Sequence, residues 1–113
     1  MRTVEEFTKI VEEENQKHLE ELLKMDNKNL IVHAYEIAKW QAIYDYMEGK
    51  VIPYLKEEEE GIFEEFLTLE INNPIATIYK YELDYDEAQW TTWDNLDLVI
   101  REMFVEIKIT TKK

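Results

Sequence analysis

Residues 30–47 read LIVHAYEIAKWQAIYDYM, and this segment is the centre of the predicted fold. Its apolar side chains recur at helical spacing and form a wide stripe, which is typical of the central helix of a small bundle. Asp26 or Asn27 can cap this helix at its start, and Gly49 suits the left-handed residue that ends a helix. We therefore predict a helix that runs to about Glu48, with its apolar set at Leu30, Ile31, Ala34, Ile37, Ala38, Trp40, Ala42, Ile43, Tyr44 and Met47.

The segment before it, residues 3–24, has the pattern of an amphipathic helix. Thr3 is followed three residues later by Glu6, which is the spacing of a capping box. The apolar stripe of this predicted helix comprises Val4, Phe7, Ile10, Val11, Leu19, Leu22 and Leu23.

The segment after it begins with residues 50–55, which include Pro53 and are expected to form a connection. A third helix near residues 54–70 would bury Leu55, Ile62, Phe63, Phe66, Leu67 and Leu69. Gly61 inside a helix costs about 1 kcal/mol relative to alanine. The helix could therefore begin at Gly61 instead, with the glutamates in a loop before it.

The C-terminal third has two possible structures. Asn73 and Pro74 fit the cap and the first residue of a further helix. Apolar residues from Ile75 to Ile107 then recur at helical spacing, but residues 78–85 and 104–110 also alternate as strands do. We predict a mainly α fold, a compact bundle of about four helices in a single domain spanning 1–113. A small β-hairpin that pairs 78–85 with 104–110 remains an alternative.

The composition excludes several classes of protein. The chain has 113 residues, of which 45% are apolar and 12% aromatic, too many for a disordered acidic tail. Because it has no cysteine, a disulfide scaffold is excluded and a reducing compartment fits. No apolar segment is long enough for a signal peptide or a membrane span. We expect a soluble cytoplasmic protein that does not bind membranes.

Charge is concentrated in residues 57–100, which hold 13 acids and one base, whereas the rest of the chain has a net charge of −1. The acids could simply serve solubility, or they could imitate the phosphates of nucleic acid. Aromatic residues among the acids could be packed in the core or could anchor a partner protein. The predicted partner-binding residues are Glu57, Glu58, Glu59, Glu60, Glu64, Glu65, Tyr81, Glu82, Asp84, Tyr85, Asp86, Glu87, Trp90, Trp93, Asp94 and Asp97.

No catalytic or metal-binding motif is present in the sequence. Serine and cysteine are absent, and two glycines are too few for a loop that cradles phosphate. Neither His18 nor His33 completes the Glu-x-x-His motif of metal-binding bundles. Asp84 and Asp86 lack the rest of a calcium loop. We therefore expect no enzyme activity, no cofactor and no metal.

The motif His33-Ala34-Tyr35-Glu36, within residues 30–47, resembles an uncharacterised family of small proteins carried on bacterial mobile elements. A second likeness covers Asn73-Pro74 and the acidic segment after it. The resemblance implies a mostly helical structure for residues 74–104 and an origin in a phage or plasmid. It implies no activity.

These observations together predict a non-enzymatic inhibitor from a phage or other mobile element. It would not bind nucleic acid itself, but would block the basic groove of a nucleic-acid-binding defence nuclease. A CRISPR effector is the expected target class, which would make the chain an anti-CRISPR-like DNA mimic. The alternative is an antitoxin-like or regulatory adaptor that binds one basic protein partner.

Overall fold

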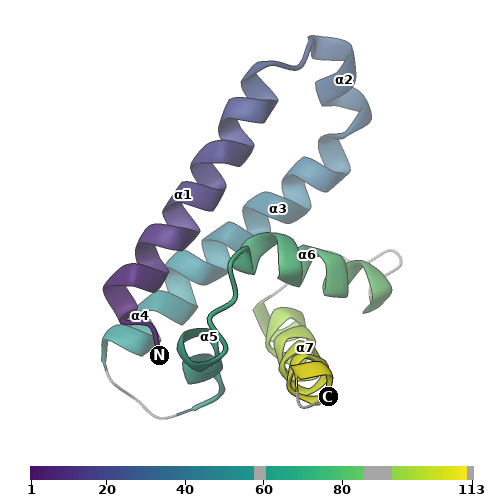
Figure 1. The fold of residues 1–113 in the computed structure, drawn as a ribbon. Coiled ribbons are helices and arrows are strands. Elements are labelled where there is room, and N and C mark those ends of the chain that lie inside the picture. Colours follow the sequence, from purple (N-terminus) through teal and green to yellow (C-terminus); the bar gives the residue numbers. More distant parts are fainter. Residues whose placement is uncertain (58–60, 86–92, 112–113) are drawn as a thin grey trace.

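A computed structural model describes residues 1–57, 61–85 and 93–111, with 82–85 and 111 described by their backbone alone. The described chain is almost entirely helical, and its long axis measures 43 Å against 29 and 28 Å for the other two. A long helical hairpin extends from a base in which the remaining helices pack (Figure 1). The predicted α class is confirmed, although the chain forms more helical segments than the four expected.

The hairpin consists of α1 (Val4–Leu23), α2 (Asn27–Val32) and α3 (Ala34–Tyr46). The capping box at Thr3 and Glu6 is present, and the carboxylate of Asp26 accepts a hydrogen bond of 2.8 Å from the amide of Asn29 at the start of α2. The predicted second helix is interrupted at His33, which separates α2 from α3.

The predicted end of this helix at Gly49 is wrong. Gly49 lies in a π-helical turn, η1 (Met47–Val51), which leads directly into α4 (Ile52–Lys56). Neither glycine has a positive φ, so Gly49 is not a left-handed cap. Pro53 is the second residue of α4, directly after the π-helical turn. The expected connection over 50–55 is therefore helical.

The next segments are short, and they begin after Gly61 as one of the two sequence interpretations proposed. A 3₁₀ turn, η2 (Ile62–Glu64), precedes α5 (Glu65–Thr68). Helix α6 (Pro74–Tyr85) starts at the predicted proline. The carboxylate of Glu14 in α1 accepts hydrogen bonds of 2.8 and 2.9 Å from the amides of Ile75 and Ala76. This carboxylate satisfies two amides at the start of α6 and fixes α6 to α1.

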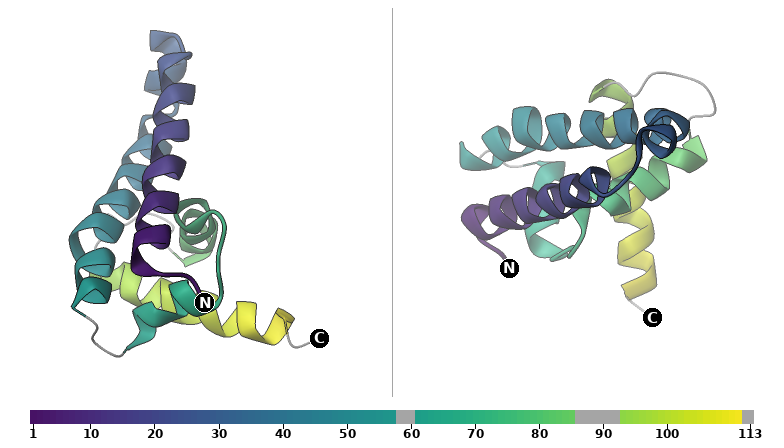
Figure 2. Two further views of the ribbon diagram at one scale, coloured as in Figure 1. Left: turned by 60° about the vertical axis from the view of Figure 1, so that its left-hand side comes forward. Right: turned by 90° about the horizontal axis from the view of Figure 1, so that it is seen from above.

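The last helix, α7 (Trp93–Thr111), lies across the base at the end of the molecule opposite α2 (Figure 2). Residues 78–85 and 104–110 are helical, so the alternative β-hairpin is wrong, and no described residue forms a strand. The alternation of Val105, Ile107 and Ile109 has another cause. Ile107 packs against the core, whereas Val105 and Ile109 lie on the exposed side of the same helix.

The core lies entirely in the base. It contains Phe7 and Val11 of α1, and continues through α3 and α4 to the faces of α5, α6 and α7 that meet there. Phe66 lies at its centre, with ring centroids 5.2 Å from Phe7 and 4.8 Å from Phe104. In contrast, no residue between 16 and 38 is buried. We call residues 16–38 the hairpin tip and the other described residues the base.

Candidate partner-binding surface

Several of the predicted binding residues lie outside the described residues. They are Glu58, Glu59, Glu60, Asp86, Glu87 and Trp90, together with the side chains of Glu82, Asp84 and Tyr85. The predictions at these positions stay predictions. Among the rest, the described acids divide into those that form contacts within the chain and those that are exposed.

Asp97 belongs to the first group. Its carboxylate accepts a hydrogen bond of 2.6 Å from the hydroxyl of Tyr46 and lies 2.5 Å from the ammonium of Lys50. The Tyr46 ring is fully buried. Burial, and then the hydrogen bond to Asp97, raise the pKa of the Tyr46 hydroxyl, so this group stays protonated. Asp97 therefore joins α7 to α3 and η1, and its carboxylate already has two partners inside the chain.

Glu65 and Tyr81 also have structural contacts. The ammonium of Lys108 lies 2.6 Å from a carboxylate oxygen of Glu65, and this ion pair joins α5 to α7. Tyr81 is half-buried and packs against the core. Of the two interpretations of the aromatic residues among the acids, core packing describes the contacts of Tyr81, and its predicted role in partner binding stays a prediction.

Trp93 fits both interpretations of the aromatic residues among the acids, because it is packed on one side and exposed on the other. Its side chain is 44% exposed, but its ring lies edge-on to Tyr46 at a centroid distance of 6.3 Å. A Cβ at Gly49 would lie 2.9 Å from the Trp93 ring, so only glycine leaves room for this contact. One side of the ring therefore packs on η1 while the rest faces solvent.

The exposed acids of the base include three of the predicted binding residues, Glu57, Glu64 and Asp94. The outer side of α7 adds two acids that sequence analysis did not select, Glu102 and Glu106. Three apolar residues lie on the same side and are 54–58% exposed. We call this surface the α7 outer face; it comprises Asp94, Leu98, Glu102, Val105, Glu106 and Ile109.

The α7 outer face follows from helical spacing. Leu98, Val105 and Ile109 are seven and four residues apart, which places them on one side of a helix. The core residues Leu96, Ile100 and Phe104 lie on the other side. A helical projection of residues 93–109 would have separated the two sets. The sequence analysis missed this surface because it looked for the one stripe that faces the core.

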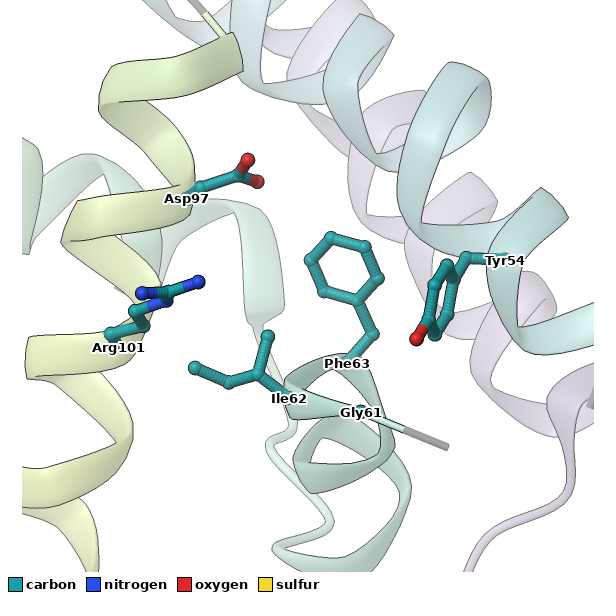
Figure 3. A pocket seen from close by; sticks show the side chains of 6 residues that line it. All are labelled: Tyr54, Gly61, Ile62, Phe63, Asp97 and Arg101. Atoms are coloured by element: carbon teal, nitrogen blue, oxygen red, sulfur yellow. The ribbon is translucent and has the colours of Figure 1, made fainter. Parts of the chain in front are cut away.

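A recess of about 490 Å³ lies beside α7, next to the residues at which the acidic segment begins (Figure 3). Ile62, Phe63 and Tyr54 form its apolar side, and Asp97 and Arg101 of α7 face them. A Cβ on Gly61 would come 2.5 Å from the Tyr54 hydroxyl, so glycine allows Tyr54 to lie across the backbone. Since Asp97 is already paired, the recess offers an apolar wall and one exposed guanidinium.

Within the described ranges, no group of three or more histidines, aspartates and glutamates is arranged to hold a metal ion. Among the described helices, none combines the length and apolar character needed to cross a bilayer. The α7 outer face offers carboxylates, which suit basic groups, and aliphatic side chains, which suit apolar ones.

Comparisons with known proteins give no family model, no curated protein sequence and no solved structure that matches this chain.

Proposed function

We propose that the protein is a non-enzymatic inhibitor that occupies the basic nucleic-acid-binding groove of another protein. The observation that carries this proposal is the composition of the α7 outer face, where exposed acids and exposed aliphatic residues occur together on one rigid helix. This composition meets the two requirements of such an inhibitor: attraction to a basic surface, and contacts that persist once bound.

The acids account for the attraction. Negative surface charge speeds encounter with a basic partner, but it gives little selectivity on its own. At about 0.15 M salt the screening length is about 8 Å, so only acids close to the partner contribute strongly. The exposed acids of the α7 outer face, Asp94, Glu102 and Glu106, would all lie close to a partner that binds this face.

The aliphatic residues account for persistence. Leu98, Val105 and Ile109 would be removed from water by a bound partner, and burying one such side chain contributes about 1.5–3 kcal/mol. Trp93 stands at the start of the same helix with nearly half of its side chain exposed. We propose it as the aromatic anchor of the contact, because aromatic residues often dominate binding energy.

The defence-nuclease target is the more specific form of this proposal. It is supported by the resemblance of residues 33–36 to proteins of mobile elements, and a CRISPR effector is the target class that fits best. The second candidate, an antitoxin-like or regulatory adaptor that binds one basic protein, would use the same surface. The two differ in whether nucleic acid and this protein exclude each other from the partner.

The experiment begins with capture of partners by the tagged protein, followed by displacement of labelled DNA from each purified partner. A double variant, Asp94→Lys with Glu102→Lys, should raise the concentration needed for displacement at least about tenfold. A second variant, Leu98→Ser with Val105→Ser, should have an effect of similar size, because each residue contributes at least about 1 kcal/mol.

The matched control is Glu20→Lys with Glu21→Lys, which makes the same charge change at exposed positions of the hairpin tip. This control should displace DNA nearly as well as the parent. Equal loss in both charge variants would mean that net charge alone acts. If the partner binds DNA and the parent protein simultaneously, the inhibitor proposal is wrong and the adaptor is favoured.

A further inference from the structure

The hairpin tip exposes an unusual number of large apolar side chains. Leu23 is 86% exposed, Ile31 75% and Val32 64%, and three further residues are at least one-third exposed, namely Leu19, Met25 and Tyr35. Single exposed apolar residues are ordinary, but six in one short segment mark an interaction site. They lie at the end of the molecule farthest from α7 (Figures 1 and 2).

The reason for this exposure is geometric. In the base, α6 packs against both α1 and α3. At the tip, α6 contributes Tyr79, which lines a cleft together with Leu22 and Met25, whereas Leu23, Ile31 and Val32 stay exposed among the described residues. Leu19, Leu23 and Ile31 belong to the stripes that the sequence predicted as core-facing, and that prediction is wrong for them because none of the described elements forms a third layer over these side chains.

A cleft of about 250 Å³ lies between the two arms of the hairpin, and Tyr79 of α6 also lines it. Its walls are largely apolar, and Leu22, Met25, Ile37 and Trp40 contribute to them. The tip therefore carries both projecting apolar side chains and an apolar recess large enough to receive one. In a two-fold symmetric contact each copy offers the same patch to the other, so a projecting side chain of one copy can enter the recess of its partner.

The charge of the tip selects the kind of partner. Residues 16–38 contain four acids and three lysines, a net charge of −1, and the rest of the chain therefore carries −12 of the total −13. Lys24 and Lys28 are exposed beside Glu20, Glu21 and Asp26. A strongly basic partner would be drawn to the base instead, whereas a second tip offers charges of both signs to pair with these.

We infer that the hairpin tip binds a second copy of this chain and forms a two-fold symmetric dimer. Twelve large apolar side chains, six from each copy, are then shielded from water. The two acidic bases stay apart, because each extends away from the tip along the 43 Å axis. Both α7 outer faces remain accessible, so the dimer would present two copies of that surface. The inference is independent of the proposed function.

Analytical ultracentrifugation of the full chain tests the inference. The parent should sediment as a species of twice its 13.7 kDa mass, in reversible equilibrium with the monomer. Leu23→Ser with Ile31→Ser should raise the dissociation constant at least about tenfold, because two buried aliphatic side chains are lost from each copy. Leu98→Ser with Val105→Ser, at exposed residues of α7, is the matched control and should leave the constant unchanged.

Three results would overturn the inference. They are a monomer at all concentrations up to the millimolar range, a dimer weakened by the α7 variant but not by the tip variant, and assembly that continues beyond two copies.

The salt dependence of the dissociation constant gives a further criterion. Raising the salt concentration from about 0.05 to 0.5 M should change a tip dimer little, because the acidic bases lie more than a screening length apart. A dimer that forms only at high salt would mean that the acidic surfaces meet instead.

Spin labels provide a measurement that does not depend on weakening the contact. The chain has no cysteine, so Lys28→Cys and Glu102→Cys each give one labelled site. Both positions are exposed, the first in the tip and the second on α7. The label-to-label distance between copies should be shorter for the tip site than for the α7 site. The reverse order would overturn the inference even if every variant were dimeric.

Discussion

The base and the hairpin tip are built from the same kind of sequence but differ in burial. In both, apolar residues recur at helical spacing, for example Phe7 and Val11 in the base and Leu19 and Leu23 in the tip. Phe7 and Val11 are fully buried, whereas Leu23 is 86% exposed. The difference is the presence of α5, α6 and α7 around the base. An apolar stripe thus predicts a helix, but only the neighbouring elements decide whether that stripe is buried.

The largest difference in stability is expected between one alanine substitution in the core of the base and one in the hairpin tip. Phe66→Ala should lower the free energy of unfolding by about 3–5 kcal/mol, because it leaves a cavity between Phe7 and Phe104. Ile31→Ala in the tip should change it by less than about 0.5 kcal/mol at protein concentrations where the chain is monomeric. Urea denaturation measures both. Similar losses in the two variants would mean that the tip has a core of its own.

A smaller effect is expected within the base, where paired and exposed acids should behave differently. Asp97→Ala removes the acceptor of the buried Tyr46 hydroxyl and the partner of Lys50, and should cost about 2 kcal/mol of stability. Asp94→Ala, at an exposed acid of the same helix, should cost less than about 0.5 kcal/mol. Thermal or urea unfolding distinguishes them. If the two variants are equally stable, Asp97 does not stabilise the fold and belongs with the surface acids, as predicted from the sequence.

The smallest expected effect is a pH dependence of the stability caused by His18, which lies in the part of the tip nearest the base. The His18 ring stacks on Trp40 at a centroid distance of 4.2 Å, and burial lowers the pKa of its imidazole below the usual 6.5. When pH falls through 6.5, the unfolded chain takes up a proton at His18 that the folded chain does not. The unfolded state is favoured accordingly, so stability should fall as the solution becomes more acidic.

The measurement is urea denaturation of the parent and of His18→Phe at pH 7.5 and 5.5. The aromatic variant keeps a ring on Trp40 but cannot titrate. The decrease in stability between the two pH values should therefore be smaller in the variant than in the parent, and the carboxylates common to both cancel in the comparison. An identical decrease in both proteins would show that His18 does not contribute.

Much of the fold could be predicted from local patterns. The capping box at Thr3, the cap at Asp26 and the start of α6 at Pro74 were all found, because each depends on residues close together in the sequence. The continuation of the helix through Gly49 and Pro53 was not found, since glycine and proline are locally typical of helix ends, and the contact of the Trp93 ring with Gly49 comes from the distant α7. The interaction between Glu14 and the start of α6 crosses 61 residues, and no local pattern contains it.

The acidic character of the candidate binding surface could be predicted from the sequence, but which of its acids are exposed and which are paired could not. Counting acids was enough to select Glu57, Glu64 and Asp94. It could not separate them from Asp97 and Glu65, because pairing with Lys50 and Lys108 is decided by tertiary contacts. The apolar part of the α7 outer face was within reach, since the spacing of Leu98, Val105 and Ile109 is a property of the sequence alone.

The π-helical turn η1 keeps the core-facing side of its helix in register although the segment holds one residue more than a regular helix would need. Buried residues occur there at every fourth position, Ile43, Met47, Val51 and Leu55. In a regular α-helix of 3.6 residues per turn, a step of four residues advances the side chain by about 40° beyond a full turn. Three such steps would turn Leu55 by about 120° relative to Ile43, and the wider turn absorbs part of that rotation. Removing one residue between 47 and 51 and closing the turn to a regular helix would leave eleven steps of about 100° between Ile43 and Leu55, which is only about 20° beyond three full turns. Leu55 would then still face the core. A regular helix that kept every residue would instead turn Leu55 away by about 120°, so the wider turn is what accommodates the additional residue.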